Sequence, residues 1–132
     1  MDKVNIMELA LYRLERANED LETSKINFES NKLKASNNRS YYAILHALRA
    51  VLALDEKDFK KHSGVISYFN QNYIKTNIFS KDVSLFVKNA SLIRNQSDYD
   101  DFYIASKEEA KEQIENAEYI IKVISEYLKN LS

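Results

Sequence analysis

The most apolar stretch of the chain runs from Asn38 to Leu54, although it also carries two arginines, two tyrosines and a histidine. Hydrophobic residues recur there at intervals of four, three and four: Tyr41, Leu45, Leu48 and Leu52. This is the spacing of one helix face, and most residues between them are small or apolar as well. The pattern predicts a helix that is buried on several sides within a bundle. The polar start of the run, with Arg39, is then carried towards the interior, which makes it a candidate site.

The segment before this run predicts an amphipathic helix from about residue 4 to Phe28. Its apolar stripe is Met7, Leu11, Leu14, Leu21 and Phe28, and charged residues occupy the other side. Ser30-Asn31 and Ser36-Asn37-Asn38 favour caps and turns, so the central helix begins near Leu33 or a few residues later and ends at about Leu54.

Three helices are predicted in the second half of the chain. A short one spans about Lys61 to Tyr73, and Gly64 near its start permits a close approach by a neighbouring segment. The next follows a helix cap at Ser80 and ends at about Arg94-Asn95, and residues 96–103 form a polar and aromatic loop. A capping-box spacing at Ser106 opens the last helix. Its apolar stripe is Ala110, Ile114, Ala117, Ile121, Ile124, Leu128 and Leu131.

These helices predict an all-α fold, because proline is absent and glycine occurs once in 132 residues, whereas sheets and hairpins depend on both for their turns. Four long helices and a short one, joined by brief connections, predict an up-and-down bundle. We expect residues 1–132 to form a single domain, in which the first and last helices flank the central one.

Composition excludes several kinds of chemistry. Cysteine is absent, so disulfides, a thiol nucleophile and zinc–thiolate sites are impossible, which fits a reducing compartment. No apolar stretch reaches the ~20 residues of a membrane span, and the start of the chain lacks a signal-peptide pattern. We therefore expect a cytoplasmic protein that does not enter a membrane. The sequence offers no paired ligand pattern for a metal, and no cofactor is predicted.

The net charge of −1 gives no general attraction to nucleic acid, but basic residues gather in the middle of the chain. These are Arg39, Arg49, Lys57, Lys60, Lys61, His62 and Arg94. A local basic surface at this place is compatible with binding phosphate groups.

Several polar residues have both a structural and a functional interpretation. Arg94 and Asp98 lie four apart, which suits either an ion pair on a helix or a shared binding site. A cation is disfavoured at a helix start, so Arg39 needs either a carboxylate, Asp98 or Asp100, or a bound phosphate.

The histidines and tyrosines have similar alternatives. His62 is either a surface or capping residue or a ligand, whereas His46 is expected to be a packed residue. Tyr41, Tyr42, Tyr99 and Tyr103 could stack on bases, or fill the core and an interface.

Four segments in order resemble the small bacterial and archaeal HEPN-domain proteins. They are Asn38–Ala43 (NRSYYA), Lys61–Gly64 (KHSG), Arg94 with Asp98-Tyr99, and the Ser106–Ala117 stretch. The resemblance extends from about Leu11 to Leu128. It implies a bundle of four to five helices that is usually dimeric. It also implies a toxin–antitoxin pair in which the partner is a minimal nucleotidyltransferase.

Many members of that family are metal-independent ribonucleases, and the resemblance implies an arginine followed, after four to six residues, by a histidine. The chain departs from this pattern, because Tyr99, Asp100 and Asp101 stand at that distance from Arg94. A tyrosine with an ordinary pKa of about 10 is a poor base near neutral pH. A ribonuclease mechanism would therefore have to recruit His62 from another element.

Three hypotheses follow. The first is a component of a two-component module that binds a nucleotide or RNA phosphate through Arg39, Tyr42, Arg94 and Asp98. The second is a metal-independent ribonuclease that uses Arg94 with His62 or Tyr99, and it gains support if His62 lies within reach of Arg94 across one surface groove. The third is a structural adaptor, which gains support if Arg39, Arg94 and Asp98 are buried and paired with one another, with no groove beside them.

Overall fold

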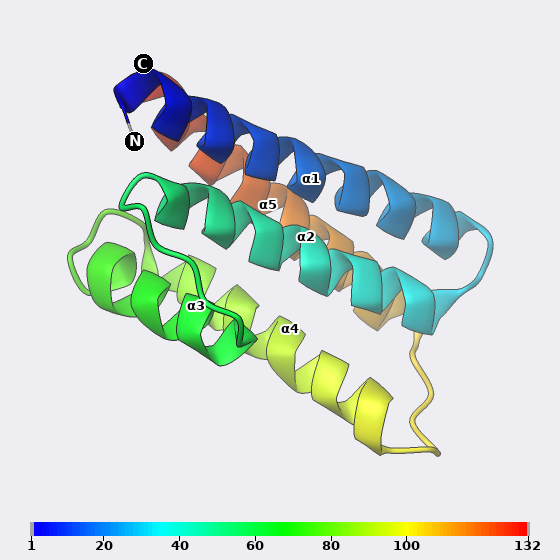
Figure 1. The fold of residues 1–132 in the computed structure, drawn as a ribbon. Coiled ribbons are helices and arrows are strands. Elements are labelled where there is room, and N and C mark those ends of the chain that lie inside the picture. Colours follow the sequence, from blue (N-terminus) through cyan, green and yellow to red (C-terminus); the bar gives the residue numbers. More distant parts are fainter. Residues whose placement is uncertain (1, 132) are drawn as a thin grey trace.

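A computed structural model describes residues 2–131, and this part of the chain is built from helices without any strand. The helices are α1 (Lys3–Glu29), α2 (Leu33–Ala53), α3 (His62–Phe69), α4 (Lys81–Tyr99) and α5 (Lys107–Leu131), with a π-helical turn η1 (Asn70–Ile74) after α3 (Figure 1). The predicted all-α fold is confirmed.

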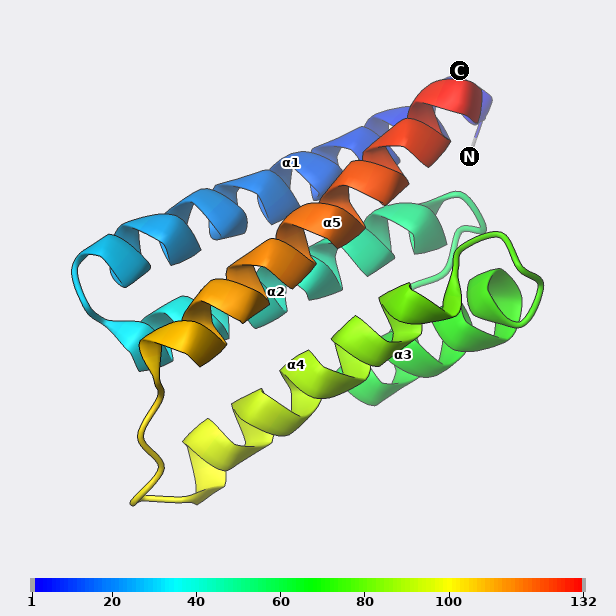
Figure 2. The ribbon, with the colours of Figure 1, turned by 180° about the vertical axis from the view of Figure 1, so that it is seen from behind.

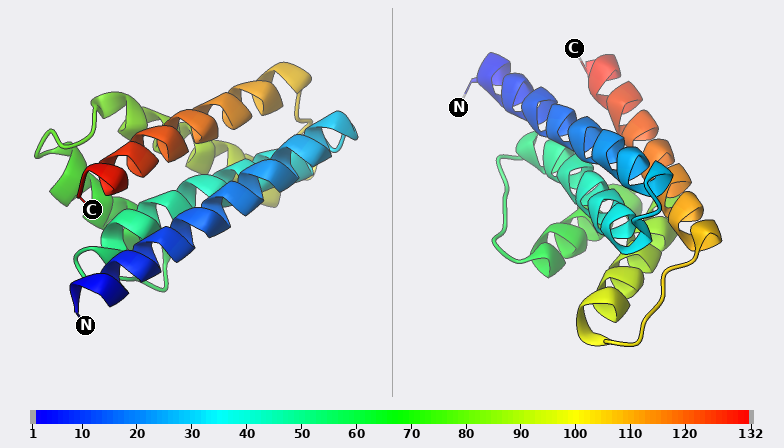
Figure 3. Two further views of the ribbon diagram at one scale, coloured as in Figure 1. Left: turned by 90° about the horizontal axis from the view of Figure 1, so that it is seen from above. Right: turned by 90° about the vertical axis from the view of Figure 1, so that its right-hand side faces the viewer.

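Helix α2 is the centre of the bundle, since it contacts α1, α3, α4 and α5. Helices α1 and α2 form a long antiparallel pair, and α5 runs beside both of them (Figures 1 and 2). Helices α3 and α4 lie on the other side of α2, and the two ends of the chain lie at the same end of the bundle (Figure 3). The predicted placement of the first and last helices beside the central one agrees with this arrangement.

The α1–α2 pair is closely packed because small residues line its seam. Ala10, Ala17 and Ser24 follow one another at intervals of seven on α1, and all three are fully buried. The Ser24 hydroxyl lies 2.6 Å from the Ser40 hydroxyl and donates to the Ser36 carbonyl oxygen at 3.0 Å. Small side chains let the two backbones approach closely, and these hydrogen bonds satisfy the buried hydroxyls. The seam therefore fixes which residues of α1 face which residues of α2.

Most predicted helix limits agree with the structure, and the exceptions have local causes. Helix α4 continues to Tyr99, beyond the predicted end at 94–95, and an ion pair between Arg94 and Asp98 spans that extra turn. The side chain of Leu11, which was predicted to be buried, is 49% exposed. The buried face of α1 is centred instead on the small residues of the seam. Leu131, the last residue of the predicted α5 stripe, is also exposed, because the helix ends there.

Gly64 is the predicted point of close approach, and the neighbour is the Phe59 side chain. A Cβ atom at residue 64 would lie 2.9 Å from the Phe59 Cβ and 3.0 Å from its Cγ. The connection from α2 to α3 can pass this close to α3 only because the side chain is absent.

Gly64→Ala is therefore expected to destabilise the protein. Overpacking costs ~1–3 kcal/mol, whereas replacing glycine within a helix gains only about 0.5–1 kcal/mol. The midpoint of chemical denaturation should fall, and Ser67→Ala at an exposed position of α3 serves as the control that changes helix propensity without a clash. A Gly64→Ala variant as stable as the wild type would show that Phe59 moves aside at no cost.

Within residues 2–131, none of the helices combines the length and the apolar content that crossing a membrane requires.

Candidate functional site

Four side chains from three helices meet on one side of α2. Tyr41 and Tyr42 come from α2, His62 is the first residue of α3, and Arg94 comes from α4. The Tyr41 hydroxyl lies 3.0 Å from His62 Nδ1, and Arg94 Nη1 lies 3.5 Å from the same nitrogen. Arg94 Nη2 donates to the Tyr42 hydroxyl at 3.3 Å. We call these four residues the Arg94 cluster.

The positive charge of the cluster is that of Arg94, and its main contacts are with aromatic rings. The Arg94 guanidinium carbon lies 4.9 Å from the centre of the Tyr41 ring and 5.5 Å from that of Tyr42, distances typical of cation–π contacts. The Arg94 side chain is 28% exposed, and its nearest carboxylate is that of Asp98, at 3.6 Å from Nε. The charge is thus only loosely compensated, so it remains available to an anion.

The environment of the cluster alters the pKa values of two of its members. Burial, reinforced by the positive charges of Arg94 and Arg49 and by His46, lowers the pKa of His62 below its ordinary value of 6.5. Burial raises the pKa of Tyr41, although Arg94 opposes this effect. His62 is therefore predominantly neutral near pH 7, and the Tyr41 hydroxyl keeps its proton. A neutral imidazole at this place can accept a proton.

A second group of side chains surrounds the Asp20 carboxylate on α1. Asp20 Oδ1 accepts a hydrogen bond from Arg39 Nη1 at 3.1 Å, and Oδ2 lies 2.7 Å from His46 Nδ1. The prediction that Asp98 or Asp100 pairs with Arg39 is therefore wrong, because the α1–α2 seam brings Asp20 to it. Arg39 also stacks on Tyr42, at 4.9 Å from the ring centre, which joins this group to the Arg94 cluster.

A polar pocket of about 240 Å³ lies beside Arg94, between the start of α2 and the end of α4. Its walls are Lys34, Ala35, Asn38, Arg94, Ser97 and Asp98. A lysine, an arginine and an amide together suit a phosphate group, and Asp98 is the one carboxylate among them.

A second polar pocket, of about 400 Å³, lies between α1, α2 and the start of α3, on the side of His62 and Tyr42 that faces α1. It is lined by Leu9, Tyr12, Arg13, Arg16, Tyr42, Leu45, His46, Arg49, Asp58 and His62. Asp58 binds both Arg13 and Arg49, at 3.5 Å and 2.7 Å. Arg16 forms no ion pair with any of residues 2–131, so its charge is open to a ligand.

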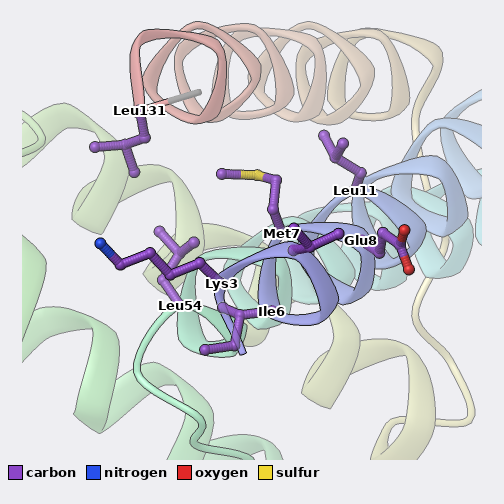
Figure 4. Close-up of a pocket in the computed structure, with 8 residues that line it drawn as sticks. Lys3, Ile6, Met7, Glu8, Leu11, Leu54 and Leu131 are labelled. Carbon is purple, nitrogen blue, oxygen red and sulfur yellow. The ribbon is translucent and has the colours of Figure 1, made fainter. Parts of the chain in front are cut away.

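A larger pocket of about 640 Å³ lies at the far end of the bundle, where α1 begins and α5 ends (Figure 4). Apart from Lys3 and Glu8 its walls are apolar, with Met7, Leu11 and Leu131 among them. Lys3 and Glu8 are the charged groups of this pocket, whereas the polar pockets combine several cationic, amide and imidazole groups and are the better candidate site.

The predicted site residues are only partly brought together. Tyr42, His62 and Arg94 meet in the cluster, and Arg39 and Asp98 border it. Tyr99 does not join them: its side chain is 86% exposed at the end of α4. Arg39 and Asp98 are about one third and one half exposed, and neither pairs with the other. The condition for the adaptor hypothesis, a buried and mutually paired set, is therefore not met.

The sequence interpretation missed His46, which was expected to be a packed residue, and its partner Asp20. A signal for His46 was present, since Arg39, Tyr42, His46 and Arg49 recur at intervals of three, four and three. These residues form a half-buried polar stripe along an otherwise buried helix. In residues 2–131, no set of three or more His, Cys, Asp or Glu side chains converges as metal ligands would.

Comparison with known proteins gives a consistent picture. The family model described as the HEPN domain matches residues 10–127. A protein of Thermotoga maritima named "UPF0332 protein" is 30% identical over 130 residues, which cover 98% of this chain and 96% of the relative. A protein of Methanocaldococcus jannaschii named "Putative toxin MJ0142" is 30% identical over 131 residues, covering 96% of this chain and 89% of the relative. A second protein of that organism, "Putative toxin MJ0605", is 30% identical over 118 residues, covering 89% and 87%.

Proposed function

The chain belongs to the HEPN domain family, and from this premise we propose that it binds RNA phosphate at the Arg94 cluster as the toxin-type component of a two-component module. The observation that carries the proposal is the state of the Arg94 guanidinium. It is held in place by two tyrosine rings, partly open to solvent, and only loosely compensated by Asp98. A fixed guanidinium with spare donors is well suited to a phosphate.

The surroundings of Arg94 suit RNA rather than an isolated anion. The two polar pockets lie on either side of the cluster, so successive groups of one strand have places to bind. Tyr42 is half-buried and lies between them, and aromatic rings commonly stack on unpaired bases. Lys34 on one side and Arg16 on the other supply charges for neighbouring phosphates.

The toxin-type role and the partner are inferred from relatives. Two similar proteins carry the name toxin, and the resemblance noted in the sequence implies a minimal nucleotidyltransferase as the second component. We propose the same partnership for this chain. Co-expression with the product of the neighbouring gene, followed by purification through a tag on one of them, tests it.

A second candidate function, metal-independent ribonuclease activity, is favoured by one distance. His62 Nδ1 lies 3.5 Å from Arg94 Nη1, so the two side chains are within reach of each other, although they line different pockets. In the tautomer that donates the Nδ1 proton to the Tyr41 hydroxyl, the neutral ring keeps a free lone pair on Nε2. His62 could then accept the proton of a 2′-hydroxyl, while Arg94 stabilises the charge on the phosphate.

The direct test is incubation of the purified protein with single-stranded RNA in the presence of a chelator. Binding is measured by fluorescence anisotropy and cleavage by gel, for the wild type and His62→Ala. Binding by both proteins with cleavage by the wild type alone supports the two functions together. Binding without cleavage leaves the phosphate-binding role and removes the ribonuclease. Absence of binding contradicts the proposal.

The pH profile of cleavage should report the lowered pKa of His62. A base must be neutral, and the pKa of His62 in the folded protein lies below 6.5. Activity expressed as kcat/KM should therefore be high at neutral pH and fall as the pH drops, with a midpoint below 6.5, because this ratio reports the free enzyme. A midpoint above 6.5 would mean that another group is the base.

We propose further that the protein is a homodimer, and one face of α4 supports this. Leu85, Leu92 and Tyr99 lie seven residues apart on α4 and are 60%, 54% and 86% exposed. Lys81 and Lys88 accompany the first half of this stripe, whereas two aspartates, at 100 and 101, follow its end. Antiparallel pairing of α4 with a second copy would cover the apolar residues and bring opposite charges together. Leu92→Glu should then convert a dimer into a monomer in analytical ultracentrifugation.

A further inference from the structure

The imidazole of His46 is oriented by a carboxylate. His46 Nδ1 lies 2.7 Å from Asp20 Oδ2, and because a carboxylate only accepts hydrogen bonds, Nδ1 carries a proton. The other ring nitrogen, Nε2, forms no hydrogen bond with any of residues 2–131. His46 borders the pocket between α1, α2 and α3, and its side chain is 20% exposed. A histidine held at one nitrogen and open at the other has the arrangement of a proton-transfer group.

His46 and His62 line the same pocket, and both rings lie beside the ring of Tyr42. The ring centre of Tyr42 is 6.4 Å from that of His46 and 5.6 Å from that of His62. The two imidazoles also interact electrostatically, since His46 contributes to the lowered pKa of His62. A phosphate bound beside Tyr42 could therefore be approached by both rings.

The charges around the two rings differ. His62 faces Arg94 and Arg49, whose positive charges disfavour a second proton on its ring. His46 faces the Asp20 carboxylate, which also binds Arg39. Two histidines in one pocket with opposite electrostatic partners suit the two halves of an acid–base reaction.

We propose that His46, oriented by Asp20, is the general acid of RNA cleavage and complements His62 as the general base. This inference rests on the ribonuclease function proposed above and assigns a residue outside the predicted site. Asp20 is a positioning residue, because it acts through His46.

The proposed step is balanced in atoms and protons. The 2′-oxygen attacks the neighbouring phosphorus, and its proton passes to His62 Nε2. The bond between phosphorus and the 5′-oxygen breaks, and that oxygen takes a proton from His46 Nε2, which leaves a neutral ring whose Nδ1–H still donates to Asp20. The products are a 2′,3′-cyclic phosphate and a free 5′-hydroxyl, without oxidant, reductant or water. Arg94 compensates the charge on the phosphate oxygens, and Arg16 is placed to hold a neighbouring phosphate.

The test uses an RNA oligonucleotide in which sulfur replaces the 5′-oxygen at the cleaved bond. A thiolate is a much weaker base than an alkoxide, so it leaves without a proton from the protein. His46→Ala should slow cleavage of ordinary RNA by ~100-fold, the usual contribution of a general acid. The same variant should cleave the sulfur-containing RNA at nearly the wild-type rate. His62→Ala should be slow on both substrates, because loss of the base does not depend on the leaving group.

Two further variants separate chemistry from folding. His46→Asn retains a side-chain N–H near the place of Nδ1, so it can keep the bond to Asp20 while it removes the acid. Asp20→Asn keeps the ring but removes the carboxylate, and its defect should also be smaller on the sulfur-containing RNA. Thermal unfolding followed by circular dichroism verifies that each variant is folded at the assay temperature.

The outcomes distinguish this inference from the function on which it rests. The inference is supported if the His46 variants cleave ordinary RNA slowly but cleave the sulfur-containing RNA at nearly the wild-type rate. If the wild type cleaves RNA and the His46 variants are as fast as the wild type, the inference is overturned while the ribonuclease function stands. The same holds if the His46 variants are equally slow on both substrates. Absence of cleavage by the folded wild type overturns both.

Discussion

Arg94→Ala is expected to lower the rate of RNA cleavage by about 10²- to 10³-fold, which is the usual loss when a donor that stabilises transition-state charge is removed. Arg94 lies 3.5 Å from His62, donates a hydrogen bond to the Tyr42 hydroxyl, and lines the pocket that contains Lys34. No other guanidinium of residues 2–131 forms a hydrogen bond with His62. A water molecule in its place would not compensate the charge that develops on the phosphate.

The thermal stability of Arg94→Ala is expected to change little. Its partners are two neutral tyrosines, a neutral imidazole and the half-exposed Asp98 carboxylate at 3.6 Å. Removing the arginine therefore leaves no buried carboxylate without a partner, which is the situation that costs several kcal/mol. Exposed ion pairs on a helix contribute a few tenths of a kcal/mol, and the cation–π contacts add about 1 kcal/mol.

Two matched variants make the result interpretable. Arg94→Lys keeps the charge but loses the planar fork, so it should recover binding more than cleavage. Lys122→Ala removes an exposed cation from α5, outside the cluster and the proposed dimer face, and should leave binding and cleavage unchanged. A large fall in melting temperature for Arg94→Ala, without loss of RNA binding by the folded fraction, would assign Arg94 a structural role.

The fold could be predicted from the sequence because each helix can be recognised from the spacing and the capping residues within its own segment. The apolar stripe of α5 and the run in α2 repeat at helical spacing, and the Ser106 cap is observed as a hydrogen bond from the Glu109 N–H at 3.1 Å. Such local signals need no knowledge of neighbouring helices. The C-terminal end of α4 was harder to predict, because the residues after Arg94 are polar. They are held in the helix partly by the ion pair between Arg94 and Asp98.

The site was harder to predict because it depends on contacts between helices. His62 and Arg94 each had a functional interpretation beside a structural one, and they do meet. Asp20 gave no such signal, since its role arises only when the small residues of the α1–α2 seam set the register of the pair. Sequence spacing indicates which residues share a face of one helix, but not which face of another helix they meet.

Ile121→Ala should lower the free energy of unfolding by ~2–5 kcal/mol, the range found for large-to-small substitutions in well-packed cores. The Ile121 side chain is 6% exposed and belongs to the continuous core formed by α1, α2 and α5. Its neighbours on the same stripe, Ala117 and Ile124, are fully buried, so little space is available for the surroundings to close the cavity. Urea denaturation measures the change.

Leu131→Ala is the matched control, because Leu131 continues the same stripe but its side chain is 53% exposed. It should change stability by about 0.5 kcal/mol or less. Equal losses for the two variants, or a small loss for Ile121→Ala, would mean that α5 is rotated relative to this core. Helix α5 contributes no residue to the Arg94 cluster, so below its lowered melting temperature Ile121→Ala should keep the RNA affinity of the wild type. A loss of stability without a loss of affinity would show that the core packing around α2 and the proposed RNA binding depend on different faces of this helix.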